Sequence, residues 1–104
     1  MRIDIKQRGV ELTSEQLASV TQRIRLALQR FAHDVASVTV TLLDINGPRG
    51  GRDKVARVRL RTRQRGAVQI EETDSEVLRA LTYAIDRVRR SFVRDLGRQR
   101  ANAV

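Results

Sequence analysis

Apolar residues recur every three or four positions between Asp74 and Arg100, which is the spacing of one face of a helix. Asp74 or Ser75 can cap the start of this helix, and negative charge at Glu76 suits the positive end of the helix dipole. We therefore predict a long C-terminal helix with one face in the core. Its buried residues are Val77, Leu81, Ile85, Val88, Phe92 and Leu96.

A second helical pattern lies near the N-terminus. Thr13 and Gln16 have the spacing of a capping box, in which each residue hydrogen-bonds to the backbone of the other. The helix that follows is predicted to run to about Ala32. Its buried stripe comprises Leu17, Val20, Ile24, Ala27, Leu28 and Phe31.

Four segments alternate between apolar and polar residues, which is typical of half-buried strands. They span residues 2–7, 38–43, 54–63 and 67–71. The order β-α-β-β-β-α predicts an α+β fold, a two-layer sandwich with both helices on one face of a four-stranded sheet. The last three strands would form an antiparallel meander. The other sheet face would be open to water and lined by Arg2, Lys6, Thr39, Thr41, Arg57, Arg59, Arg61, Arg63 and Gln69.

The composition excludes several classes of protein. The 104 residues fit one domain, predicted over residues 1–98, with a flexible tail at 99–104. The chain has no cysteine and one histidine, so it offers neither a disulfide nor a typical metal site. No apolar run is long enough to span a membrane, and the N-terminus lacks the apolar segment of a signal peptide. We expect a cytoplasmic protein that uses no cofactor, membrane or small-molecule substrate.

The charge of the chain points to an anionic partner. Lysine and arginine number 21 against 12 acids, giving a net charge of +9, and the pI of about 11.6 suggests binding to nucleic acid. Nearly all the bases are arginine, whose planar fork suits bidentate contact with phosphate. The charged residues between positions 67 and 78 are all acids. We interpret these acids, which are Glu71, Glu72, Asp74 and Glu76, as capping and dipole-compensating residues of the C-terminal helix in preference to a metal cluster.

Arginines gather on the C-terminal helix, on the side away from its apolar stripe. We expect no acid to interrupt this line, so the arginines would repel one another and serve no purpose in folding. An anionic partner would relieve the repulsion. Tyr83 lies in the same line and either stacks on a base or covers the helix stem. With few other aromatics, contact with the backbone of structured RNA fits better than stacking on single strands. The predicted RNA-binding residues are Arg79, Tyr83, Arg87, Arg90 and Arg94, with Arg23, Arg25 and Arg30 of the first helix.

Other motifs carry less chemistry. The serines have no general base in a recognisable motif, so we predict no enzymatic activity. Gly47 to Gly50 form a GxxG motif, but strands flank it where the KH domain has helices. This hairpin is either a basic loop that touches phosphate or a plain solvent-exposed turn. Possible secondary contacts to RNA or a partner are Arg49, Arg52, Lys54, Arg57, Arg59 and Arg61.

Three stretches together resemble one protein family. They are VELTSEQ at residues 10–16, DINGPRGGRDK at 44–54 and AIDRVRRSFVRDL at 84–96. With the element order, they are similar to the ribosome hibernation-promoting factor and ribosome-associated inhibitor family, some members of which carry the label of sigma-factor modulation protein. The resemblance covers essentially residues 1–98 and implies a fold like that of a double-stranded-RNA-binding domain.

The resemblance also implies a function. Family members bind ribosomal RNA in the small-subunit channel for messenger and transfer RNA, silencing idle ribosomes as a stress response. The family's basic positions fall on Arg87, Arg90 and Arg94, and on Arg23, Arg25 and Arg30 of the first helix. The short hibernation-factor form is the nearer match, because the sequence stops soon after the second helix without an acidic tail.

Two alternatives stay open at this point. The chain could be a general structured-RNA-binding module without preference for ribosomes, or a regulator that docks on an acidic protein. We expect a monomer in isolation. Whether the protein pairs ribosomes or only blocks single ones does not follow from the sequence.

Overall fold

The computed structural model describes residues 1–45, 53–64 and 66–102 of the chain. The elements follow the predicted order. They are β1 (Arg2–Arg8), α1 (Ser14–Leu28) with a 3-10 turn (Gln29–Phe31), β2 (Val35–Asp44), β3 (Lys54–Thr62), β4 (Ala67–Asp74) and α2 (Val77–Asn102).

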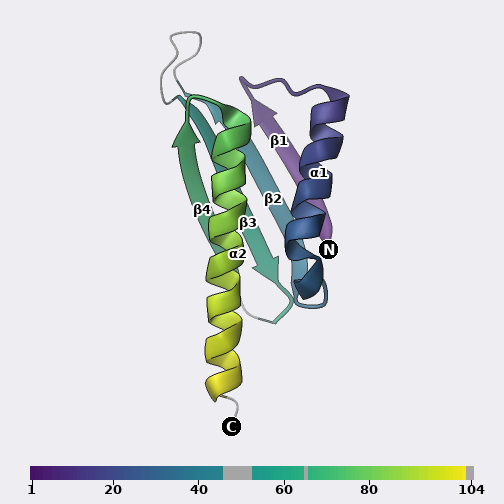
Figure 1. Cartoon of the computed structure of the whole chain (residues 1–104), viewed down its shortest axis with the longest axis vertical. Helices are drawn as coiled ribbons and strands as arrows, with labels where there is room; N and C mark the ends of the chain where they lie inside the picture. The colour runs from purple at the N-terminus through teal and green to yellow at the C-terminus, as the bar shows by residue number, and fades with distance from the viewer. Residues whose placement is uncertain (46–52, 65, 103–104) are drawn as a thin grey trace.

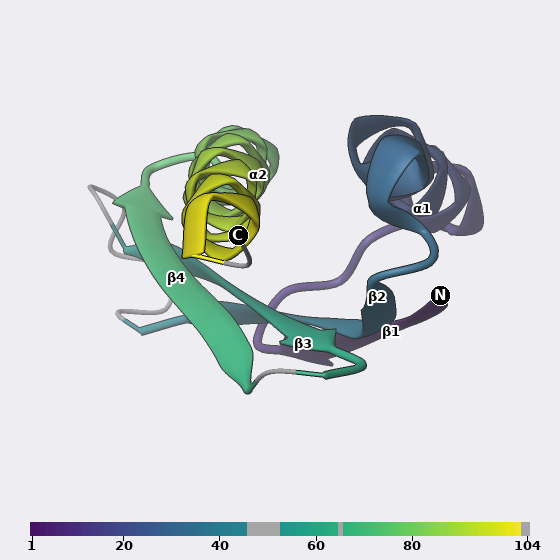
Figure 2. The same cartoon turned by 90° about the horizontal axis from the view of Figure 1, so that it is seen from below.

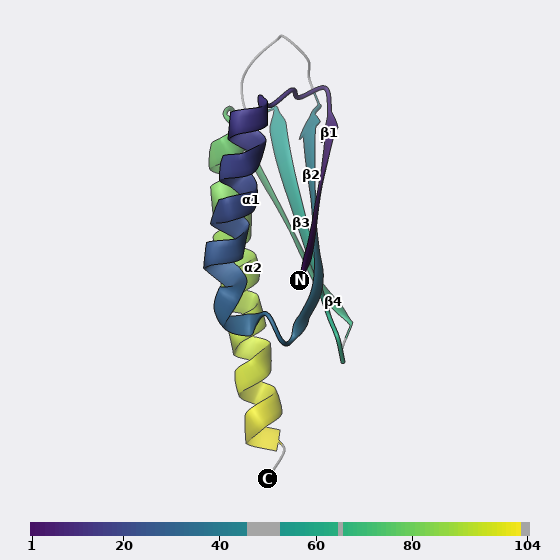
Figure 3. The ribbon, with the colours of Figure 1, turned by 90° about the vertical axis from the view of Figure 1, so that its right-hand side faces the viewer.

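The strands form one sheet in the order β1-β2-β3-β4. β1 runs parallel to β2, because the chain crosses over through α1 between them, and β2, β3 and β4 form an antiparallel meander. Both helices lie on the same face of the sheet (Figures 1 and 2), and the side view shows two layers (Figure 3). The predicted α+β sandwich is therefore confirmed.

The N-terminal helix begins as the capping box predicts. The Gln16 backbone N–H donates to the Thr13 hydroxyl at 3.1 Å, and the Thr13 N–H donates to Gln16 Oε1 at 2.9 Å. These bonds satisfy two backbone donors that a helix start leaves without partners. The helix then tightens into the 3-10 turn, so its last predicted residues do not continue as α-helix.

The core lies between the sheet and the two helices. Ile24 and Leu28 of α1, Val40 and Leu60 of the sheet and Val88 of α2 are each at most 1% exposed. The ring centroids of Phe31 and Phe92 lie 5.1 Å apart in an edge-to-face contact, which joins the end of the first helix to the second.

Several strand boundaries differ from those predicted, and three of the differences have a clear structural cause. β2 begins at Val35, ahead of a register irregularity between Val35 and Ser37 that interrupts its alternation. β3 ends at Thr62, and the Arg63 N–H donates instead to the Asp34 carbonyl at 3.0 Å. β4 continues to Asp74, which pairs with Lys54, so α2 begins only at Val77.

The C-terminal helix also runs further than expected. α2 continues to Asn102, into the segment predicted to be a tail, and extends past the sheet (Figure 1). Residues 103–104 lie outside the described part of the chain. That the tail is flexible stays a prediction.

Replacement of Phe92 by alanine should destabilise the domain. The side chain is 3% exposed, and truncating a buried phenylalanine costs about 3–5 kcal/mol of the free energy of unfolding. Val93→Ala is the matched control, because its neighbouring side chain is 46% exposed and should cost less than about 0.5 kcal/mol. Urea denaturation followed by circular dichroism measures both. Equal losses in the two variants would contradict the packing described here.

Candidate nucleic-acid interface

Strand β4 and helix α2 run side by side in opposite directions, and their spacing decides which residues meet (Figure 1). The helix-facing residues of β4 are Val68, Ile70, Glu72 and Asp74. A strand advances about 3.3 Å per residue and a helix about 1.5 Å, so each step along β4 passes about two residues of α2. The acidic end of β4 therefore lies beside the first half of α2, and the apolar end lies beside the second half.

Asp74 binds the first arginine of the helix. Arg79 Nη2 lies 2.7 Å and Nε 2.9 Å from Asp74 Oδ1, which also accepts the Glu76 backbone N–H at 3.0 Å. The hydrogen bond from the Arg79 guanidinium, supported by the Glu76 N–H, holds the pKa of Asp74 well below its usual range. The same pair raises the pKa of Arg79. The expected capping role of Asp74 is thus combined with an ion pair.

The next arginines are also paired, contrary to the prediction from the sequence. Arg87 Nη1 lies 2.6 Å from Glu72 Oε1 across the β4–α2 interface. Asp86 lies between the arginines on the helix itself, 3.1 Å from Arg90 and 3.4 Å from Arg89. The acids at the end of β4 are therefore partners of arginines as well as helix-start residues, and the arginine line does contribute to folding.

The second half of α2 keeps uncompensated charge. Arg94 is exposed and has no carboxylate partner among the side chains that the structure describes. A hollow of about 300 Å³ opens beside it between β4 and α2, and its lining residues are Ile70, Arg87, Arg90, Ser91 and Arg94. Three guanidinium groups around one open hollow provide many N–H donors and no acceptor of their own, which suits phosphate oxygens.

The arginines of the first helix do not join this hollow. Arg23 Nη1 donates to the Thr82 hydroxyl of α2 at 2.7 Å, and the Arg30 guanidinium lies 5.8 Å from the centre of the Phe31 ring. Arg23 is exposed on the flank of α1 that faces α2, whereas Arg25 is exposed on the opposite flank. Arg30 is exposed in the 3-10 turn that follows α1. The predicted site is therefore divided into separate groups.

Arg89 is a basic residue that the sequence reasoning missed. It lies seven residues after Thr82, hence on the same side of α2, toward α1. Its heptad spacing from Thr82 was visible in the sequence, but nothing there showed which flank of α2 faces α1. Tyr83 is 51% exposed, in line with Arg79 and Arg90.

The residues predicted as secondary contacts differ in whether their charge is already paired within the chain. Lys54 lies 2.9 Å from Asp53 and 3.2 Å from Asp44, and the hydrogen bond to Asp53 raises the pKa of Lys54. Arg57 is paired with Glu71 across the β3–β4 ladder, at 2.5 Å. Arg59 and Arg61 are exposed. Arg49, Arg52 and the GxxG motif lie outside the described residues.

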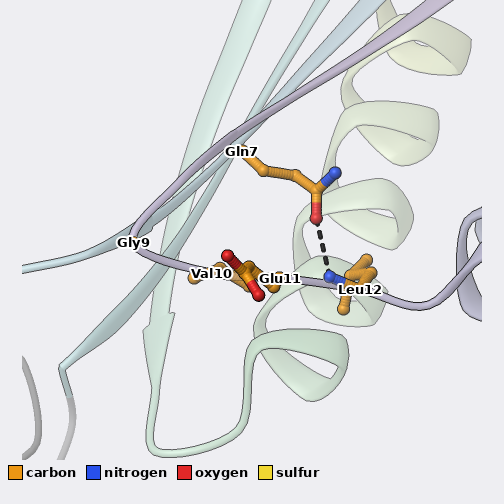
Figure 4. A pocket seen from close by; sticks show the side chains of 5 residues that line it. All are labelled: Gln7, Gly9, Val10, Glu11 and Leu12. Atoms are coloured by element: carbon orange, nitrogen blue, oxygen red, sulfur yellow. Dashed lines mark hydrogen bonds between the residues drawn. The ribbon is translucent and has the colours of Figure 1, made fainter.

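A further hollow, of about 700 Å³, lies at the β1–α1 connection (Figure 4). There the Leu12 N–H donates to Gln7 Oε1 at 2.7 Å, which closes the turn before the helix. Gly9 has φ +72°, and a Cβ at this position would lie 3.3 Å from the Cβ of Asp44. Among the described residues, no lysine or arginine lines this hollow, which favours a structural role over one in binding RNA.

The described part of the chain contains no group of three or more His, Cys, Asp or Glu residues placed to hold a metal ion. Within the same residues, no helix has both the length and the apolarity needed to cross a membrane.

Comparison with solved structures gives two proteins of the same fold. The N-terminal domain of Thermus thermophilus Protein Y superposes with a TM-score of 0.70 at 20% identity, over 88% of this chain and 94% of that one. A ribosomal subunit interface protein from Coxiella burnetii superposes with a TM-score of 0.74 at 10% identity, over 93% of this chain and 99% of that one. No family model and no curated protein matches the sequence. The fold class is therefore that of these ribosomal subunit interface and Protein Y domains.

The Asp74–Arg79 pair should make stability depend on pH. Because folding lowers the pKa of Asp74 from 3.8, the pair stabilises the fold fully above that value and loses its effect as the pH falls through the lower folded pKa. Asp74→Asn should therefore be less stable than wild type at about pH 7, and the difference should shrink below about pH 4. Chemical denaturation across this range measures it, with the exposed Glu11→Gln as control. A difference that stays constant down to about pH 2 would contradict the assignment.

Proposed function

We propose that the chain is a member of the ribosome hibernation-promoting factor and ribosome-associated inhibitor family. In this proposal it is a non-enzymatic cytoplasmic inhibitor of translation that binds the small ribosomal subunit near the channel for messenger and transfer RNA. The observation that carries the proposal is the hollow lined by Arg87, Arg90 and Arg94, because the basic positions of the family fall on these three residues. The fold shared with a ribosomal subunit interface protein supports it.

The mechanism is occlusion by charge and shape. The guanidinium groups of α2 bind phosphates of ribosomal RNA, and the domain then occupies space that messenger and transfer RNA need. Three phosphate contacts predict that log affinity falls against log salt with a slope of about −2 to −3. Arg79 adds little to this slope, because it stays bound to Asp74.

The two alternatives predict different behaviour. A general RNA-binding module would bind free duplex RNA as tightly as the small subunit. A regulator that docks on an acidic protein would bind neither at moderate salt. The open hollow of arginines favours a phosphate ligand over a protein carboxylate. Carboxylates of the chain itself already pair with Arg79 and Arg87, and the hollow stays open beside these ion pairs.

The triple change Arg87→Ala, Arg90→Ala, Arg94→Ala should abolish saturable binding to purified small subunits in co-sedimentation at moderate salt. The loss of three phosphate contacts should weaken binding by at least about 100-fold, at about 1.4 kcal/mol per tenfold. The control Arg2→Ala, Lys6→Ala, Arg8→Ala removes the same charge from exposed positions on β1 and should bind nearly as wild type does. Messenger and transfer RNA should displace the wild-type protein. Binding no tighter than to random duplex RNA, or unchanged in the helix variant, would overturn the proposal.

Removal of the Glu72 carboxylate should strengthen binding. Glu72→Gln releases Arg87 from its partner 2.6 Å away, so this arginine no longer has to break an ion pair to reach phosphate. We expect about three- to tenfold tighter binding to small subunits, with a salt slope still at about −2 to −3, because Arg87 already counts among the three phosphate contacts. Glu11→Gln, which removes an acid elsewhere, serves as the control. Weaker binding by a folded Glu72→Gln protein would show that the pair itself positions Arg87 for the RNA.

A further inference from the structure

The sheet face opposite the helices carries a regular arrangement of side chains. Four rows cross all four strands on this face. From β1 to β4, three of them are Lys6, Thr41, Arg57 and Glu71; Asp4, Thr39, Arg59 and Gln69; and Arg2, Ser37, Arg61 and Ala67. The fourth is Arg8, Leu43, Val55 and Thr73. Neither helix covers this face (Figure 3).

The arginines of β3 differ in their neighbours along these rows. Arg57 lies opposite Glu71 and is bound to it. Arg59 lies between Thr39 and Gln69, and neither neighbour is charged. Arg2 binds the one acid of that row, Asp4, at 3.1 Å. Among the described residues, Arg59 has no carboxylate partner.

Arg61, one row further along, also lacks a charged cross-strand neighbour. Its cross-strand neighbours are Ser37 and Ala67, both small and uncharged, and it has no ion pair within the described residues. The exposed Arg63 follows just beyond the end of the strand. Within the part of the chain that the structure describes, three arginines at alternate positions therefore have no acidic partner at the end of β3 and just beyond it.

These arginines surround a second hollow of about 360 Å³ at the β3–β4 connection. Its lining residues are Arg59, Arg61, Thr62, Arg63, Gln64, Gly66 and Ala67. Gly66 has φ +41°, and apart from its chain neighbours no described residue has an atom within 4 Å of where its Cβ would be, so this side of the turn is open. The described residues of this lining include no acid, and the uncharged ones are small or can donate hydrogen bonds.

We propose that this end of the open sheet face is a second phosphate-binding surface, which takes a segment of RNA backbone other than the one held by α2. The inference rests on the proposed function for the nature of the partner. Arg59 and Arg61 are two residues apart on an extended strand, so their side chains emerge about 6.7 Å apart, close to the separation of consecutive phosphates in an RNA strand. A second copy of the chain is a poor occupant, because it would bring the same positive charge to the same place.

The two surfaces lie on opposite sides of one edge strand. β4 is at the edge of the sheet, with α2 packed on one side of it (Figure 2). By the strand register, the Arg59 row crosses its other side. A domain that binds RNA on both sides is held between two segments of RNA. That geometry belongs to a folded RNA such as the wall of a ribosomal channel, and a single free duplex does not provide it.

The double change Arg59→Gln, Arg61→Gln tests the surface. We expect binding to purified small subunits to weaken about tenfold or more and the salt slope to become shallower by about 2. One control, Lys6→Gln, Arg8→Gln, removes the same charge from exposed positions on β1. The other, Arg57→Gln, Glu71→Gln, removes the neutralised pair from the same strand face. Affinity within twofold of wild type and an unchanged slope in the double variant would overturn the proposal.

A second measurement identifies the RNA at each surface. The chain has no cysteine, so Gln69→Cys on the sheet face and Ser91→Cys beside the α2 hollow can each carry one tethered iron chelate that cleaves nearby RNA. We expect cleavage of two different segments of ribosomal RNA. Specific cleavage from Ser91→Cys with only background cleavage from Gln69→Cys would refute the second surface and leave the proposed function intact. If neither probe cleaves small-subunit RNA, both the second surface and the proposed function are refuted.

Discussion

The ion pairs between the end of β4 and the first half of α2 determine where this protein keeps free positive charge. Asp74 binds Arg79 and Glu72 binds Arg87, because the acidic end of the strand lies beside the start of the helix. Further along, the strand offers apolar residues such as Ile70, so the later arginines face no strand carboxylate. The same strand thus stabilises one end of the helix and leaves the other end available to a phosphate ligand.

Most of the fold could be predicted from the sequence, since each element has a clear hydrophobic period and α1 has a capping box. The end of β4 could not. The segment Glu71 to Asp74 has no apolar alternation, and acids just before a helix resemble a cap. What makes it a strand is its partner, because β3 extends to Lys54, which pairs with Asp74. Local propensity does not contain that information.

The candidate site was predictable in part. The helical period placed Arg87, Arg90 and Arg94 on one side of α2, and the structure gathers them around a single hollow. The ionic partners were missed, because they depend on how strand and helix pack. Asp86 is the exception, since its spacing from Arg90 marks an ion pair within the helix and could have been recognised. On the open sheet face, the register alone separates the neutralised Arg57 from Arg59 and Arg61.

Together these features describe a small domain with arginines on two sides of an edge strand, some of them paired with the chain's own acids. The central claim is that the second half of α2 contacts ribosomal RNA in the decoding channel. A cryo-electron microscopy reconstruction of the protein bound to small ribosomal subunits tests this most directly. The account predicts density for the domain in the path of messenger and transfer RNA, with Arg90 and Arg94 against RNA phosphates. Density elsewhere on the subunit, or in the channel with this face of α2 turned to solvent, would contradict it.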